Sequence, residues 1–255
     1  MKKEVSIIKI GGQNFEQEAD LNAFVSSIGK INGPLIIVHG AGTIASKMSK
    51  QLGIESPMVD GRRITSKENM EILAMVFSGL NKKLVAKLMG ANKQALGLSG
   101  ADFKLLPANF RKHPSIDFGY VGDIIQEEVN GSVLEKLLAM ECIPVISSMT
   151  CTKDGELLNT NADSIALSLA LYFSKNWVVN LRYCFGFEGI LKDIKKPEDY
   201  FQNLNEKEVQ NLIDNGVISG GMLPKINNAL VAAKSGIKVN IGSFNQLSKG
   251  TSIVT

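Results

Sequence analysis

Three segments of the chain carry the residue types that chemistry on an anionic group requires. They are Lys9–Gly12, Leu158–Asp163 and Ser219–Lys225. Each combines a charged lysine or aspartate with glycine or with hydrogen-bonding asparagine. Lysine keeps its positive charge at neutral pH, and glycine lets backbone N–H groups approach a ligand closely. These patterns indicate sites that hold a phosphate or a carboxylate.

Two glycine-rich loops follow predicted strands, the first at Gly11-Gly12 and the second at His39–Gly42. In a doubly wound α/β sheet, ligands gather beyond the carboxyl ends of the strands, and a helix after the loop adds its positive N-terminus. Taken singly, each glycine pair is explained slightly better by an ordinary tight turn, although Lys9 beside the first pair favours a site. Neither loop has the dinucleotide pattern G-x-G-x-x-G or the G-K-[ST] ending of a Walker A loop. Dehydrogenase and P-loop functions are therefore disfavoured.

The other two segments lie at predicted helix starts. An Asn or Asp there is usually a cap, but Asn159, Asn161 and Asp163 are three polar residues in five positions, more than one cap needs. Lys225 stands in the first turn of a predicted helix, where the positive helix end repels it unless an anion is bound. Both features point to a ligand.

The elements that position these residues alternate between strand and helix. Apolar runs predict strands at Val5–Ile10, Pro34–Val38, Gln94–Leu98, Ile143–Ser147, Trp177–Leu181 and Val239–Ile241. Helical spacing predicts helices at Asp20–Ile28, Thr43–Leu52, from Ser66 to about Leu88, and at Leu134–Met140, Ala162–Tyr172, Glu206–Asp214 and Leu223–Ser235. Such alternation predicts an α/β fold with a mainly parallel sheet covered on both faces. Residues 104–130 predict hairpins that project from this sheet and could cover a substrate.

Composition excludes several classes of function. The 255 residues are 44% hydrophobic, and the net charge of +3 is scattered, so we expect neither a nucleic-acid partner nor a membrane partner. Cys142, Cys151 and Cys184 lack C-x-x-C spacing, which predicts reduced thiols, and His39 and His113 are isolated, so we expect no metal site. No apolar stretch reaches the roughly 20 residues that span a bilayer. We expect a cytoplasmic protein.

Seven motifs in order resemble the amino acid kinase family, most closely its acetylglutamate kinase branch. They are Lys9–Gly12, His39–Gly42, Gly61–Thr65, Gly97–Gly100, Tyr120–Asp123, Leu158–Asp163 and Gly220–Lys225. The resemblance implies a three-layer αβα sandwich with a mainly parallel central sheet. It also implies an N-terminal lobe, residues 1–174, for acyl-amino-acid binding and dimerisation, and a C-terminal lobe, residues 175–255, for nucleotide. The chain begins almost at its first predicted strand, and by the resemblance this favours a homodimer.

The resemblance further implies a reaction, the transfer of the γ-phosphoryl group of ATP to the side-chain carboxylate of N-acetyl-L-glutamate or N-succinyl-L-glutamate, in arginine biosynthesis. Mg²⁺ would arrive with the nucleotide. By the family pattern Lys9 and Lys225 would hold the phosphoryl oxygens, Asp163 would orient both lysines, and Gly11 and Gly12 would supply backbone donors. The acylated amino acid would lie against Ala41, Gly42, Arg63 and Asn159, and the nucleotide against Gly220, Gly221 and Met222.

Three positions depart from the family pattern. Ala41 replaces a glycine, which requires a backbone angle that alanine tolerates. Tyr183–Gly189 replaces the usual Asp-Val-x-Gly segment, so nucleotide contacts cannot be transferred to it. Arg62 stands where an apolar residue is common; it is either a solvated surface arginine or a partner for a second carboxylate, as on an N-succinyl group. Two further alternatives stay open, a kinase of the same family with another carboxylate or phosphate substrate, and a non-catalytic sensor of the same fold.

Overall fold

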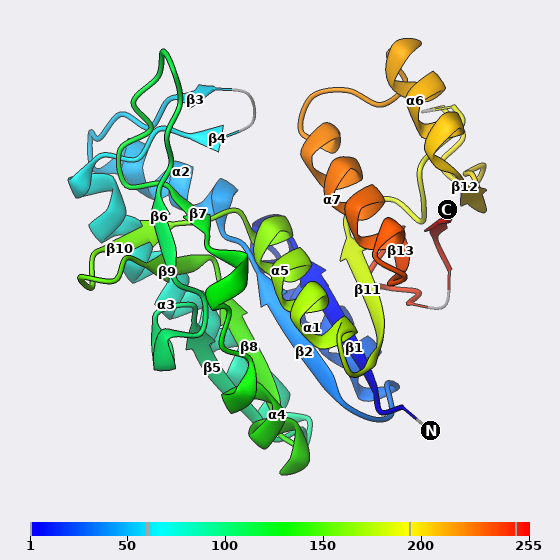
Figure 1. Cartoon of the computed structure of the whole chain (residues 1–255), viewed down its shortest axis with the longest axis horizontal. Coiled ribbons are helices and arrows are strands. Elements are labelled where there is room, and N and C mark those ends of the chain that lie inside the picture. The colour runs from blue at the N-terminus through cyan, green and yellow to red at the C-terminus, as the bar shows by residue number, and fades with distance from the viewer. Residues whose placement is uncertain (1, 60–61, 194, 248) are drawn as a thin grey trace.

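The computed structural model describes residues 2–59, 62–193, 195–247 and 249–255, with the backbone alone at 13 and 14. Its centre is an eight-stranded sheet in the order β12-β14-β13-β11-β1-β2-β8-β5 (Figure 1). The strands are β1 (Glu4–Ile10), β2 (Leu35–His39), β5 (Ala95–Ser99), β8 (Ile143–Ser147), β11 (Val178–Cys184), β12 (Asn203–Leu204), β13 (Lys238–Gly242) and β14 (Thr251–Ile253). The run from β13 to β5 is parallel throughout, and β14 is antiparallel to β13.

Helices cover both faces of this sheet. They are α1 (Glu18–Gly29), α2 (Gly42–Gln51), α3 (Lys67–Gly90), α4 (Ser132–Ala139), α5 (Ala162–Ser174), α6 (Glu206–Asp214) and α7 (Met222–Lys234). Figure 1 shows α5 and α7 in front of the strands. Successive side chains of β1 point to opposite faces of the sheet. Ile7 packs in the core under α4, α5 and α7, and Ile8 packs in the core under α1 and α3. Because both faces are buried, the central strands are continuous apolar runs.

Side chains fix several helix starts. Ser66 Oγ accepts a hydrogen bond from the Asn69 backbone N–H before α3, and Asn161 Oδ1 accepts one from the Asp163 N–H before α5. Asn205 and Glu208 form a capping box at α6. Asn161 is therefore a cap, as its place in the sequence allowed.

Short hairpins stand near the carboxyl ends of the parallel strands. They are formed by β3 (Met58–Val59) with β4 (Arg62–Arg63), β6 (Ala108–Phe110) with β7 (Gly122–Ile124), and β9 (Met149–Cys151) with β10 (Leu157–Asn159), and short 3-10 turns lie at η1 (Gly12–Phe15), η2 (Asp102–Lys104) and η3 (Gln126–Glu128). Isolated bridges join Val121 to Asn159 and Thr65 to Gly119, so these hairpins form one connected group. The hairpin predicted in residues 104–130 is confirmed as β6 and β7.

The predicted α/β class with a mainly parallel, doubly covered sheet is confirmed. The strand predicted at Trp177–Leu181 runs on to Cys184, which adds part of the segment that departs from the family pattern. β12 and β14 were not predicted, because each is only two or three residues long. Among the described residues, no helix is both long and apolar enough to cross a membrane.

Candidate active site

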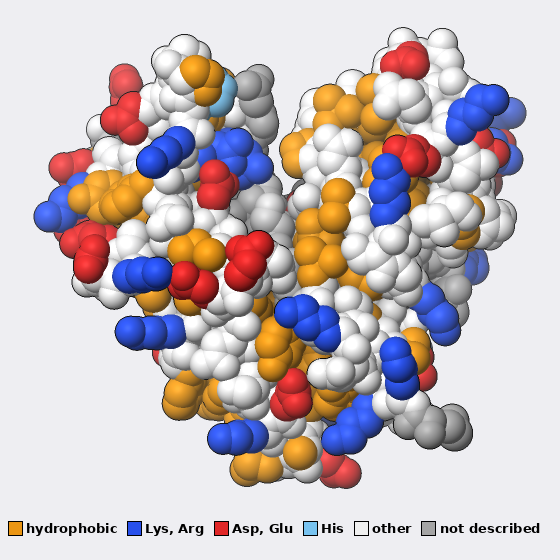
Figure 2. All heavy atoms as spheres, in the orientation of Figure 1, with side chains coloured by type: hydrophobic (Ala, Val, Ile, Leu, Met, Phe, Trp, Pro, Cys, Tyr) orange, Lys and Arg blue, Asp and Glu red, His pale blue; other side chains and the backbone are white. Residues whose placement is uncertain are grey.

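A cavity of about 230 Å³ lies at the carboxyl ends of β1 and β2. It brings together eight of the site residues predicted from the sequence, namely Lys9, Gly11, Gly12, Ala41, Gly42, Arg63, Asn159 and Asp163. The remaining four, Gly220, Gly221, Met222 and Lys225, lie at the start of α7 and do not line it. Figure 2 shows the surface hollowed between the hairpins and α7, with hydrophobic side chains along the α7 side. Gly61, which opens one of the family motifs, lies outside the described residues.

Two lysines and an aspartate form the charged centre of the site. Lys9 Nζ, at the end of β1, lies 2.8 Å from Asp163 Oδ1 in the first turn of α5, and both side chains are about 10% exposed. This contact is a short, buried ion pair. Burial, and next the charge of Lys9, lowers the pKa of Lys225, while Asp163 opposes the shift. Both ammonium groups therefore lie within electrostatic range of one carboxylate, and only Lys9 is paired with it, an arrangement suited to an anion.

Gly12 and Ala41 pack backbone against backbone on the cavity wall. A Cβ atom on Gly12 would stand 2.6 Å from Ala41 Cα, so only glycine fits at position 12. Ala41 has φ −145° and ψ 20°, a negative φ that an L-residue adopts. The expectation that alanine is tolerated in this loop is confirmed. α2 begins at the next residue, Gly42, so its positive end faces the cavity.

Arg63 is buried and is fixed by the start of α2. Its Nη2 donates hydrogen bonds to Gly42 O (2.9 Å) and Ser46 Oγ (2.7 Å), and its Nη1 donates one to Ser56 Oγ. Burial lowers its pKa, and within the described ranges no carboxylate lies within ion-pair distance. A buried guanidinium with unused donors at a cavity wall fits an anionic ligand.

Asn159 ends β10 and also lines the cavity. Its Nδ2 donates to Thr65 Oγ1 (3.1 Å), and its backbone N–H donates to Tyr120 O (2.8 Å). These bonds join β10 to the two other hairpins, so the amide is held at the cavity by the group that contains Arg63.

His39 lies beneath the glycine loop at the end of β2 and is fully buried. The Asn81 amide lies 3.1 Å from its Nε2, and the Phe15 ring packs 5.4 Å away. Burial lowers the pKa of His39 to about 4. His39 is therefore a packing residue of the core.

The buried His39 predicts a loss of stability in mild acid. Since its folded pKa of about 4 lies below the ordinary 6.5, the unfolded chain takes up a proton first as the pH falls. The free energy of unfolding is unaffected above pH 6.5 and decreases below it, by about 2 kcal/mol at pH 5. Urea unfolding at pH 7.5 and 5 should show this fall, and His39→Gln, which takes up no proton, should lack it. His113→Gln, at the exposed second histidine, should keep it; an equal fall in His39→Gln contradicts the assignment.

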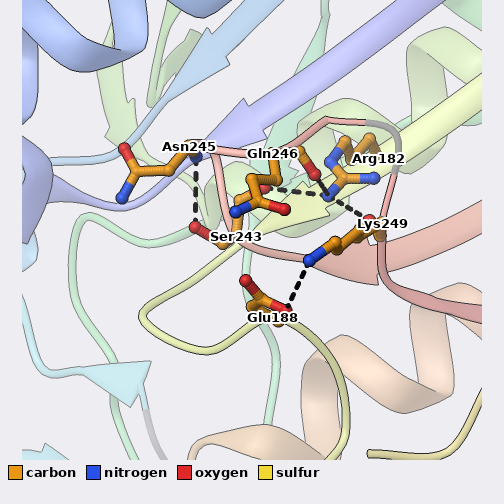
Figure 3. A network of polar contacts seen from close by, with 6 residues as sticks. All are labelled: Arg182, Glu188, Ser243, Asn245, Gln246 and Lys249. Atoms are coloured by element: carbon orange, nitrogen blue, oxygen red, sulfur yellow. Dashed lines mark hydrogen bonds and ion pairs between the residues drawn. The ribbon is translucent and has the colours of Figure 1, made fainter. Parts of the chain in front are cut away.

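Two residues near the site were missed in the sequence. Arg182 is buried within β11 and donates to Asn240 Oδ1 and to the backbone carbonyls of Ser243, Gln246, Leu247 and Lys249, as Figure 3 shows in part. An arginine inside an apolar strand was a visible signal. Phe185 places its ring 5.1 Å from Lys225 Nζ. No local pattern predicts that contact, because the two residues come from separate elements.

Comparison with known proteins identifies the family. The model of the amino acid kinase family matches residues 4–243. The acetylglutamate kinase of Bacteroides fragilis is 40% identical over 93% of this chain and 90% of its own, and that of Parabacteroides distasonis is 39% identical over 92% of each. The crystal structure of smu.665 from Streptococcus mutans UA159 superposes with a TM-score of 0.81 at 28% identity, covering 98% of both chains. The chain belongs to the amino acid kinase family.

Proposed function

We propose that this protein is an ATP-dependent kinase that phosphorylates the side-chain carboxylate of N-acetyl-L-glutamate in arginine biosynthesis. One observation carries the proposal: the Lys9–Asp163 ion pair, with Lys225 near it, lies at one end of a cavity whose wall holds the buried cation Arg63. The names of the relatives, acetylglutamate kinase, support the same substrate.

In the proposed reaction a carboxylate oxygen attacks the γ-phosphorus of ATP. The new O–P bond forms as the bond to the β,γ-bridging oxygen breaks, which yields an acyl phosphate and ADP. The carboxylate is already ionised at neutral pH, so no general base is needed, and catalysis rests on position and charge. Lys9 and Lys225 would neutralise the negative charge of the phosphoryl oxygens. Asp163 would offset the repulsion between the two ammonium groups.

The two substrates would occupy opposite parts of one continuous sheet. We assign the acylated amino acid to residues 1–174, against Ala41, Gly42, Arg63 and Asn159. The nucleotide is assigned to residues 175–255, at the Gly220–Met222 start of α7, where a helix N-terminus suits phosphate. Mg²⁺ would enter with the nucleotide and share its phosphate charge.

A trapping assay tests this proposal. Purified protein with Mg-ATP and N-acetyl-L-glutamate should release ADP and form a hydroxamate when hydroxylamine traps the acyl phosphate. ADP release without hydroxamate would indicate transfer to water and contradict the proposal, and turnover only when a phosphate monoester is added as acceptor would favour another kinase of the family. No turnover with any acylated glutamate, together with retained binding, would favour a non-catalytic sensor.

Arg62 gives a specific reason to test a second acyl group. It lines the cavity beside Arg63, and its pKa is lowered first by burial and then by the charge of Arg111. The nearby carboxylate of Asp123 is paired with Arg111 at 2.7 Å. An N-acetyl group carries no charge for Arg62 to meet, whereas an N-succinyl group ends in a carboxylate.

We therefore predict that Arg62→Ala discriminates between the two substrates. With N-succinyl-L-glutamate, kcat/KM should fall about 10- to 100-fold, the cost of one charge-assisted hydrogen bond. With N-acetyl-L-glutamate it should stay near the wild-type value. A variant that treats both substrates as the wild type does would leave Arg62 as a solvated arginine.

We also propose a homodimer that forms through α3 and the edge strand β5. Met75, Gly79, Lys82, Ala86 and Met89 follow at alternating spacings of four and three residues and form one exposed stripe on α3. Leu96 is exposed on β5, which pairs only with β8 among the described strands. Exposed methionines on either side of a glycine allow two helices to pack closely. A second copy of the chain presents the same stripe, so α3 of one copy can pack against α3 of the other.

Light scattering should give twice the chain mass of 27.6 kDa. Gly79→Arg should shift the protein to the monomer, since a long charged side chain would enter the contact. Gly29→Arg, at an exposed glycine at the end of α1, is the matched control and should stay dimeric. A dimer that survives Gly79→Arg would place the interface elsewhere.

A further inference from the structure

The ammonium group of Lys225 rests on an aromatic ring. Its Nζ lies 5.1 Å from the centroid of the Phe185 ring, within the roughly 6 Å over which a cation and a π face attract. Phe185 directly follows β11, and Lys225 is in the first turn of α7. The contact therefore joins the two elements that border the nucleotide side of the site.

Little else in the described part of the chain holds this ammonium. Lys225 makes no ion pair within 4 Å and no hydrogen bond there, in contrast to Lys9, which contacts Asp163. Its side chain is partly buried and faces the like charge of Lys9. A lysine has four rotatable bonds, and fixing it costs up to about 2 kcal/mol of side-chain entropy. The ring face offsets part of that cost.

Phe185 is itself held in a rigid frame. Its backbone N–H donates to Gly242 O (3.0 Å) at the end of β13, and the edge of the Phe187 ring packs against it at 5.9 Å. Gly242 has no room for a side chain, because a Cβ atom would stand 2.5 Å from Glu188 O and 2.9 Å from Arg182 Nη2.

Arg182 completes this frame. Its guanidinium donates hydrogen bonds to the carbonyls of Ser243, Gln246, Leu247 and Lys249, and Lys249 Nζ lies 3.5 Å from Glu188 Oε2 (Figure 3). These contacts tie the loop after β13 to β11 and to the segment that follows Phe185.

We propose that Phe185 is a positioning residue whose ring holds the Lys225 ammonium where the γ-phosphoryl group arrives. The inference rests on the proposed function, in which Lys225 neutralises that group. It assigns a role to the segment that departs from the family pattern. Because the ring acts on the lysine and not on either substrate, its loss lowers kcat and leaves both KM values nearly unchanged.

The test compares two substitutions at position 185. Phe185→Leu keeps an apolar side chain and removes the π face, so kcat should fall about 3- to 30-fold, the range expected for a partly desolvated cation–π contact. Phe185→Tyr keeps the face and should retain kcat within about twofold. Phe201→Leu is the matched control, since its ring faces Lys192 at 5.9 Å and does not line the cavity; its kinetics should equal those of the wild type.

A double-substitution cycle separates positioning from a general structural effect. In a Lys225→Met background, Phe185→Leu should cause no further fall in single-turnover rate, because the group it positions is gone. An unchanged kcat in Phe185→Leu, or an equal fall in both backgrounds, overturns the inference while wild-type turnover upholds the proposed function. A wild type without turnover overturns both.

Discussion

Replacing Lys225 by methionine is expected to lower kcat for acyl phosphate formation about 10³-fold, with both KM values within about threefold of the wild type. Methionine keeps the length and the apolar contacts of the lysine stem, so the change removes chiefly the charge. That charge should matter most in the transition state, where negative charge spreads over the transferred phosphoryl oxygens. Steady-state rates of hydroxamate formation at saturating ATP and acylated glutamate measure the effect.

Lys234 offers a matched control on the same helix. Its Nζ pairs with Glu206 Oε1 at 2.7 Å on the surface, near the end of α7, and such exposed pairs contribute little. Lys234→Met should therefore retain the wild-type kcat and a similar thermal midpoint. Equal losses in the two variants would indicate damage to α7, and a wild-type rate in Lys225→Met would remove this lysine from the proposed mechanism.

The sequence predicted that Lys9 and Asp163 lie together, and the structure brings them within 2.8 Å for a topological reason. Lys9 lies near the carboxyl end of β1, and Asp163 lies in the first turn of α5, which follows β8 and the short β9–β10 hairpin. Because β1 and β8 run parallel in one sheet, both residues lie at the same edge of that sheet. The hydrophobic periodicity of β1, β2 and α5 was strong enough to place these ends. The position of a residue at the carboxyl edge of the sheet is predictable once the strands are known.

Other parts of the fold depend on tertiary contacts that leave no local pattern. β14 exists because Thr251–Ile253 pairs with β13, and three residues carry too weak a signal to predict it. The buried charge of Arg182 within β11 is stabilised by backbone carbonyls of a loop about sixty residues later in the chain. The Phe185 contact with Lys225 likewise depends on how β11 and α7 pack. Local hydrophobic periodicity predicts where helices and strands lie in the sequence, whereas these contacts form only when the elements pack together.

Arg63→Ala is expected to lower kcat/KM for N-acetyl-L-glutamate about 10³-fold, mainly by raising its KM, while the KM for ATP stays within about twofold. A guanidinium has five N–H donors, and three are engaged by Ser56, Gly42 and Ser46, which leaves two for a ligand. We assign these donors to the α-carboxylate of the substrate, which does not react, and without the Arg63 side chain this carboxylate would enter a buried cavity unpaired. Arg63→Lys should recover only a small part of the loss, because an ammonium cannot hold the loop and the carboxylate together.

Two measurements distinguish the loss of a substrate contact in Arg63→Ala from a folding defect. Arg111→Ala removes a guanidinium of the neighbouring hairpin that pairs with Asp123 and does not line the cavity, so turnover of N-acetyl-L-glutamate should be unchanged. Thermal unfolding of Arg63→Ala with and without ATP shows whether the nucleotide side still binds. If Arg63→Ala instead raised the KM for ATP and left that of the acylated amino acid unchanged, the cavity between the hairpins and β1 would belong to the nucleotide, and the assignment of the two substrates would have to be exchanged.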